Sequence, residues 1–192
     1  VPVATSLIVG NSGGTALSGI ANTAVGYQAL NVTTTGTNNT AVGYQAMLSN
    51  INGYDNTAFG TSALKNVTSG FSNTALGSNA LYSVTAHFEN TAVGYYALRL
   101  NATNSNTAVG YAALTSSTTG QYLTALGHSA LFSNTTGSNN TALGKSALTA
   151  NTTGSNNNAV GYLALSATTT GTDNVAVGVS ALAANTVGQY NV

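Results

Sequence analysis

This 192-residue chain contains no cysteine and very few charged side chains. Without cysteine it has neither a disulfide framework nor a thiolate metal site. Three basic and three acidic residues give a formal net charge of zero, so the chain lacks the positive surface that binds nucleic acid or an anionic membrane. No run of about 18 apolar residues is present, as a membrane-spanning helix would require. We therefore predict no cofactor, no metal, no nucleic-acid partner and no membrane insertion.

The most prominent feature of the sequence is one phrase repeated ten times, approximately Asn-Thr-Ala-Val-Gly-Tyr-x-Ala-Leu. Its glycines are Gly26, Gly43, Gly60, Gly77, Gly94, Gly110, Gly127, Gly144, Gly161 and Gly178. They recur every 17 residues, except for one step of 16 after Gly94. A fixed period of this size is typical of one structural unit stacked on copies of itself. We expect one repeat domain at residues 21–192, a degenerate coil around Gly10 and Leu17 at residues 1–20, and a longer parent chain.

Positions within a coil can be numbered from this glycine, which is position 0. Alanine occupies positions −2 and +3 in all ten copies, and leucine occupies +4 in nine, with Met47 as the exception. Position −1 is always Val, Leu or Phe. The arms between glycines are short and rich in Thr, Asn and Val, which disfavours helices. We predict an all-β protein, a parallel β-solenoid of about ten 17-residue coils with two short strands in each.

Two further columns are polar or small. A second glycine stands at +10 in eight copies, and His87 and Asn104 replace it in the others. Because Asn and His tolerate positive φ better than most residues, we expect a left-handed backbone at +10. Asparagine stands at −4 in nine copies, with Leu123 as the exception. Stacked amides can hydrogen-bond along the axis of a cross-β array, so this column predicts an asparagine ladder.

Adjacent apolar residues, Ala-Val before the glycine and Ala-Leu after it, indicate more than one buried face. Successive strand residues point to opposite sides, so either both faces are buried or the pair sits at a corner. We expect self-association, as a parallel trimer with possible end-to-end stacking. Four valines would then face the common axis: Val25, Val42, Val93 and Val109.

The phrase resembles the head repeats of trimeric autotransporter adhesins and similar repeats in viral and bacterial tail-fibre-type proteins. Matching triplets include Ala41-Val42-Gly43 and Ala108-Val109-Gly110, and the resemblance covers residues 22–188. It implies a left-handed parallel β-roll, three chains side by side, and an adhesive stalk on a cell or virion surface. The adhesin repeat is shorter, and the extra residues here fall in the polar arm.

Two sets of residues are candidates for glycan chemistry. Tyrosines at position +1 could contact surface glycans: Tyr27, Tyr44, Tyr95, Tyr111 and Tyr162. Asn-x-Ser/Thr sequons could accept glycans: Asn31, Asn38, Asn66, Asn101, Asn134, Asn139 and Asn151. No catalytic residue is assigned. Asp55 and Glu89, two coils apart at −5, are favoured as solvated turn residues over a glycosidase pair. Each could instead meet the base at +5, Lys65 or Arg99, either within a coil or between chains.

The preferred function is therefore a non-catalytic structural or adhesive fibre segment outside the cell. A carbohydrate-binding tail-fibre module is one alternative. An ice-binding solenoid that uses its threonine columns is another, although a flat ice face needs Thr-x-Thr on one side of a strand. Only Thr33/Thr35 and Thr168/Thr170 have that spacing without an intervening glycine.

Overall fold

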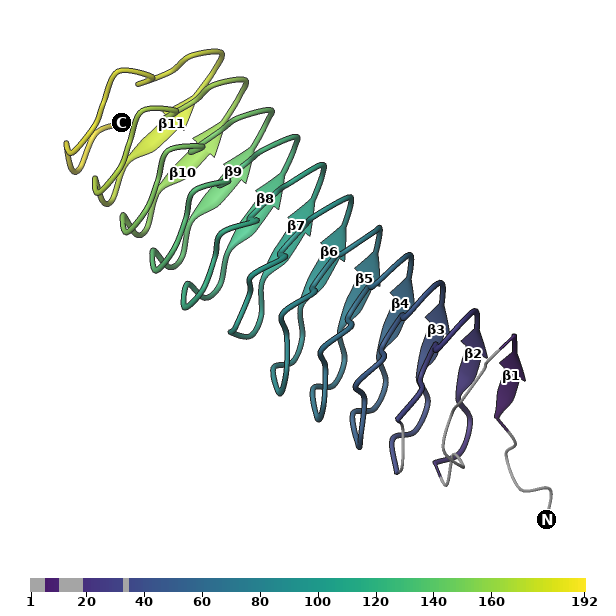
Figure 1. Cartoon of the computed structure of the whole chain (residues 1–192). Coiled ribbons are helices and arrows are strands. Elements are labelled where there is room, and N and C mark those ends of the chain that lie inside the picture. Colours follow the sequence, from purple (N-terminus) through teal and green to yellow (C-terminus); the bar gives the residue numbers. More distant parts are fainter. Residues whose placement is uncertain (1–5, 11–18, 33–34) are drawn as a thin grey trace.

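A three-residue strand recurs once in each coil of the computed structural model, which describes residues 6–10, 19–32 and 35–192 (Figure 1). The strands within these residues are β1 (Leu7–Val9), β2 (Thr23–Val25), β3 (Thr40–Val42), β4 (Thr57–Phe59), β5 (Thr74–Leu76), β6 (Thr91–Val93), β7 (Thr107–Val109), β8 (Thr124–Leu126), β9 (Thr141–Leu143), β10 (Asn158–Val160) and β11 (Val175–Val177). All pair in parallel and in sequence order. The predicted all-β parallel solenoid with 17-residue spacing is confirmed.

The strands β2–β11 stack in strict register, and each presents a central alanine followed by Val, Leu or Phe. Ala41 lies opposite Ala58, and Ala58 lies opposite Ala75. The short step after Gly94 does not disturb the pairing, since Ala92 still lies opposite Ala108. Thr and Val favour extended backbone, and their side chains point away from the alanine between them. The shortened coil therefore loses its residue in the polar arm and keeps the sheet continuous.

The prediction of a second strand in each coil is wrong for the residues that the structure describes. After the glycine the chain makes a series of turns in which positions +2 and +4 have positive φ, for example 55° at Gln45 and 48° at Met47. Left-handed conformations are unfavourable for such residues and persist only where surrounding structure enforces them. Here the adjacent coil enforces them, because Gln45 N donates to Tyr27 O and Met47 N donates to Ala63 O.

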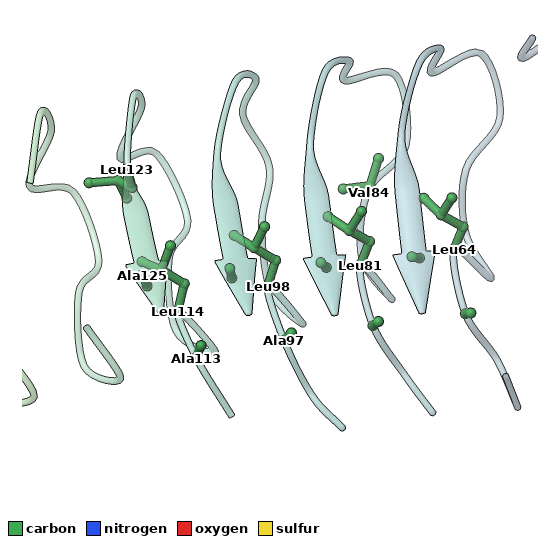
Figure 2. Packing of buried hydrophobic residues seen from close by; sticks show 14 of the residues in the cluster. Leu64, Leu81, Val84, Ala97, Leu98, Ala113, Leu114, Leu123 and Ala125 are labelled. Atoms are coloured by element: carbon green, nitrogen blue, oxygen red, sulfur yellow. The ribbon is translucent and has the colours of Figure 1, made fainter. Parts of the chain in front are cut away.

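The hydrophobic core is a thin column of alanine and leucine. Both alanine columns and the leucine column are buried in the coils between Ala24 and Leu165, which confirms their predicted place inside (Figure 2). The left-handed turn at +4 explains why two successive residues, such as Ala113 and Leu114, both face inward. Alanine allows the strand and the turning arm to approach closely, and leucine fills the remaining space.

The two glycine columns serve different purposes. At position 0, Gly110 has φ of 137°, and an added Cβ would lie 2.5 Å from Gly127 O. The prediction of a left-handed backbone at +10 is wrong: Gly36 does not have positive φ, but a Cβ there would lie 2.5 Å from Gly53 O. Close packing between coils therefore accounts for this second glycine at the positions where it occurs, such as Gly36. The left-handed residue follows two positions later, at position −5 of the next coil, as at Asp55.

The asparagine ladder is confirmed. Asn39 Nδ2 donates to Asn22 Oδ1 within its column and to Gly53 O in the polar arm, at 3.1 and 2.7 Å. Asn39 Oδ1 accepts from both the backbone N and the Nδ2 of Asn56. This pattern stops at Leu123, which has no side-chain oxygen, and resumes between Asn140 and Asn157. The ladder thus satisfies buried backbone groups that a three-residue strand cannot reach.

At the N-terminal end, β1 pairs with β2 with Ile8 opposite Ala24, where the predicted degenerate coil begins. Leu17, also part of that prediction, lies outside the described residues. The described part of the chain has no helix long and apolar enough to cross a membrane.

Candidate functional site

The outer face of the sheet carries two parallel rows of side chains. The first, the threonine row at −3, consists of Thr23, Thr40, Thr57, Thr74, Thr91, Thr107, Thr124 and Thr141. The second, the apolar row at −1, consists of Val25, Val42, Phe59, Leu76, Val93, Val109, Leu126, Leu143, Val160 and Val177. All members of both rows are exposed or partly exposed. The bulkiest are among the most exposed, with Phe59 at 54% and Leu76 at 47%.

The apolar row therefore points away from the protein's own core. Strand alternation turns the alanine inward, so its two neighbours must face outward. Burial follows this rule in each strand from β2 to β10, where only the central alanine is buried. Neither row carries a formal charge. At the usual spacing of about 4.8 Å between strands, ten coils make a continuous apolar strip about 45 Å long.

The candidate glycan-contact tyrosines lie beside this strip and are exposed, from 40% at Tyr95 to 52% at Tyr111. Four of them stack in two pairs across neighbouring coils, whereas Tyr162 lies under Lys145, whose Nζ is 5.9 Å from the ring centroid. Ring centroids of Tyr27 and Tyr44 are 5.5 Å apart, and those of Tyr95 and Tyr111 are 5.4 Å apart. Tyr111 also stacks on His128 at 4.9 Å. Stacking occupies ring faces that a sugar would need and leaves mainly ring edges and hydroxyl groups for contact.

A second aromatic stack escaped the sequence analysis. Tyr54, Phe71 and Phe88 lie at +11 in three consecutive coils, with centroids 4.9 and 4.7 Å apart. Tyr54 and Phe71 also form an isolated parallel bridge. Their 17-residue spacing was the available signal. This stack holds the polar arms of neighbouring coils together at a position that has no regular β-strand.

The basic side chains pack over tyrosine rings. Lys65 Nζ and Arg99 Cζ each lie 5.7 Å from the ring centroid of Tyr82, and Arg99 also lies 5.0 Å from that of Tyr96. Among the described residues, no contact joins these bases to the acids of their own coils. The possible pairing within a coil is therefore wrong. The acids instead accept hydrogen bonds from neighbouring polar groups.

The seven sequons are not equally accessible. Asn101, Asn134 and Asn151 are fully buried, and their Nδ2 atoms donate to backbone or side-chain oxygens inside the coil. A glycan at any of these three would displace the interior, so they do not suit the folded chain. The other four have side chains that are at least partly exposed: Asn31, Asn38, Asn66 and Asn139.

The histidine, aspartate and glutamate side chains are spread over several coils in the part of the chain that the structure describes. No group of three or more His, Asp or Glu side chains there could hold a metal ion. Asp55 and Glu89 are exposed at −5, two coils apart, with Ser72 in the coil between. His87 is partly buried, its Nδ1 lacks a partner, and burial lowers its pKa.

Of the two Thr-x-Thr pairs, Thr168/Thr170 does not form an outer face. Thr168 is buried and its Oγ1 donates to Asn185 O, while Thr33 lies outside the described residues. On the outer face of the sheet, threonines form the single row at −3, beside the apolar row, and further exposed threonines such as Thr119 and Thr136 lie in the polar arms.

Comparison with known proteins identifies no relative: no family model, curated protein or solved structure matches the chain.

Proposed function

We propose that this chain is a non-catalytic structural segment of an extracellular adhesive fibre or stalk on a cell or virion surface. Parallel copies associate along the outer face of the sheet, most simply as a trimer. The observation that carries this proposal is the apolar row, which runs along β2–β11 and faces away from the chain's own core.

The size of the row supports association. Burying the exposed part of one such side chain contributes on the order of 1 kcal/mol. Ten rungs contribute on the order of 10 kcal/mol per chain, which is comparable with the ~4–15 kcal/mol that association costs. The gain grows with every coil, whereas the loss of translational and rotational freedom occurs once. A long rod of this design therefore associates more readily than a short one.

A trimer follows from the shape of the row. A single narrow strip per chain can meet its equivalents around an axis that runs along the rod, and cyclic symmetry closes such contacts without leaving an open edge. The repeat regularity, the scarcity of charge and the resemblance to adhesin head and tail-fibre repeats support the fibre role. The scattered acids support a non-catalytic segment.

The test compares two Val→Asp substitutions by light scattering after size-exclusion chromatography. Val93→Asp places a charge in the apolar row, where association would bury three unpaired copies, so the oligomer should dissociate. Val187→Asp adds the same charge at an exposed position of a polar arm, away from both rows, and it should leave the mass unchanged. An unchanged mass for Val93→Asp with an oligomeric parent, or a monomeric parent, would contradict the proposal.

Ice binding is the second candidate, and the threonine row favours it. Eight outward threonines recur in register over consecutive strands β2–β9, next to branched apolar side chains. The same face cannot bind ice and also be covered by another copy. Thermal hysteresis from a monomeric chain, abolished by Thr74→Lys, would favour ice binding over fibre assembly.

A further inference from the structure

The acids and two of the bases occupy opposite edges of the associating face. Asp55 and Glu89 lie at −5, before the threonine row, and Lys65 and Arg99 lie at +5, after the tyrosine column. Along the chain, the order in such a coil is acid, threonine row, apolar row, tyrosine column, base. The base lies next to the tyrosine column in space as well, because Arg99 packs 5.0 Å from the ring of Tyr96, which stacks on Tyr95. The two acids are 34 residues apart, and so are the two bases, which places each pair of like charges two coils apart.

These charges have no ionic partner within the described chain. Asp55 Oδ1 accepts from Asn38 Nδ2 at 3.0 Å, and Glu89 Oε2 accepts from Ser105 Oγ at 3.2 Å. Both acids are exposed. Lys65 and Arg99 are held over Tyr82, which fixes their position without neutralising them. A chain with six charged residues thus presents three acids on one edge, Asp55, Glu89 and Asp173, and two bases on the other.

We infer that these edges pair between copies and select the parallel, in-register arrangement; this inference rests on the self-association proposed above. Rotation about the rod axis places the acid edge of each copy beside the base edge of the next. Asp55 then meets the neighbour's base at +5 of the same coil, and Glu89 does so two coils further along. Equal spacing on both edges allows both contacts in one register.

An antiparallel arrangement of two copies would bring like charges together. If two copies face each other with their rods reversed, a two-fold axis perpendicular to the rod places acid edge beside acid edge and base edge beside base edge. Like charges held next to each other at an interface are unfavourable and suppress the wrong arrangement. The edges therefore specify orientation and register, while the apolar row supplies most of the attraction.

One acid serves as a built-in control. Asp173 also lies at −5, but position +5 of its coil is Ala183. Its Oδ1 accepts from Asn156 Nδ2 at 2.9 Å, which is the same type of contact that Asp55 makes. Changing Asp173 alters the acid edge without breaking a matched pair.

The first experiment measures association by sedimentation equilibrium at low salt for four variants. Asp55→Lys with Glu89→Lys places bases opposite bases at both matched pairs, and Lys65→Glu with Arg99→Glu places acids opposite acids there. Each double variant should weaken association about tenfold or more. The quadruple variant exchanges the edges and should recover to within about threefold of the parent, while Asp173→Lys should stay within about twofold. High salt should reduce these differences.

The second experiment reports orientation through a disulfide, since the parent has no cysteine. In a parallel assembly, Val42→Cys copies meet at the axis and should cross-link on oxidation. In an antiparallel assembly, cross-links would instead require a mixture of Val42→Cys with a Cys near the other end, such as Val160→Cys.

The outcomes separate the two proposals. A monomeric parent overturns both. If the parent is oligomeric but the Cys variants cross-link only in the mixed sample, the parallel arrangement is overturned. If Val42→Cys cross-links by itself, but association is unchanged in both double variants or is not recovered in the quadruple variant, edge pairing is overturned and assembly through the apolar row remains.

Discussion

Replacing Asn56 with Asp tests the ladder that holds the coils together. The substitution preserves shape but exchanges an amide donor for a carboxylate oxygen. Asn56 is fully buried, and its Nδ2 donates to Gly70 O at 2.8 Å and to Asn39 Oδ1 at 3.1 Å. The aspartate would direct an oxygen at both of these oxygens. Its own Oδ1 would still accept from Asn73.

The expected cost follows from the two lost donations. Leaving a buried polar group unpaired costs ~1–3 kcal/mol, so the variant should lose about 2–6 kcal/mol at neutral pH. Burial and the facing oxygens raise the pKa of the introduced carboxyl above its unfolded value. An acid whose folded-state pKa is raised is most destabilising at high pH. Protonation at lower pH restores one donor, so the stability difference from the parent should shrink as pH falls.

Chemical unfolding followed by circular dichroism at about pH 7.5 and about pH 4.5 measures both effects. Asn52→Asp, four residues earlier in the chain, is the matched control, because Asn52 is exposed and the same charge there should cost little. Equal losses for the two variants, or a loss at Asn56 that grows on acidification, would refute the reasoning about the ladder.

Two further predictions concern the core and pH. Ala108→Leu should overpack the space between the strand and the turning arm and lower the free energy of unfolding by about 1–3 kcal/mol or more. Thr107→Leu, on the outer face of the same strand, should cost less. Thermal unfolding measures the difference, and equal effects would contradict the inward direction of Ala108. His87 has a lowered pKa in the folded chain because burial penalises its charged form, so its contribution to stability is present above about pH 6.5 and lost below it. His87→Gly, the residue found here in most coils, should reduce the loss of stability between about pH 7.5 and pH 5; an unchanged pH profile would contradict this.

The sequence predicted the features that depend on repetition. Period, parallel stacking, inward alanine and leucine columns and the asparagine ladder all follow from identical residues meeting identical residues in the next coil. The break at Leu123 was visible as the one missing amide. The outward direction of the apolar row at Val93 and Val109 also agrees with the expectation that these valines do not serve the chain's own core.

The features that were missed depend on backbone conformation enforced by neighbouring coils. Leu114 is an unlikely candidate for positive φ by local preference, yet its φ is 51°, and its N–H donates to Ala130 O of the next coil. Local propensity therefore favoured a second strand where the structure has turns. The sequence alignment of the short coil was also off by one residue. In most coils the asparagine at −4 donates to the carbonyl of the glycine at +10, but Asn90 donates to Thr103 O and not to the carbonyl of Asn104.

In the candidate site, residue types were easier to predict than contacts. Exposure of Tyr111 followed from a column that also accepts Lys145, but its stacking on Tyr95 and His128 required the spacing between coils. The positions of Asp55 and Lys65 in the coil were readable, whereas the packing of Lys65 over Tyr82 was not. Long side chains have several possible partners in neighbouring coils, and sequence alone does not rank them.

The most direct test of assembly through the outer sheet face is the mass of the unmodified chain across a dilution series, measured by sedimentation equilibrium. Three chains of 19.0 kDa give about 57 kDa, and this mass should persist until dilution separates the copies. A folded, cooperatively unfolding species of 19.0 kDa at every concentration would contradict the account, because the apolar row would then remain open to solvent in a stable single-chain solenoid.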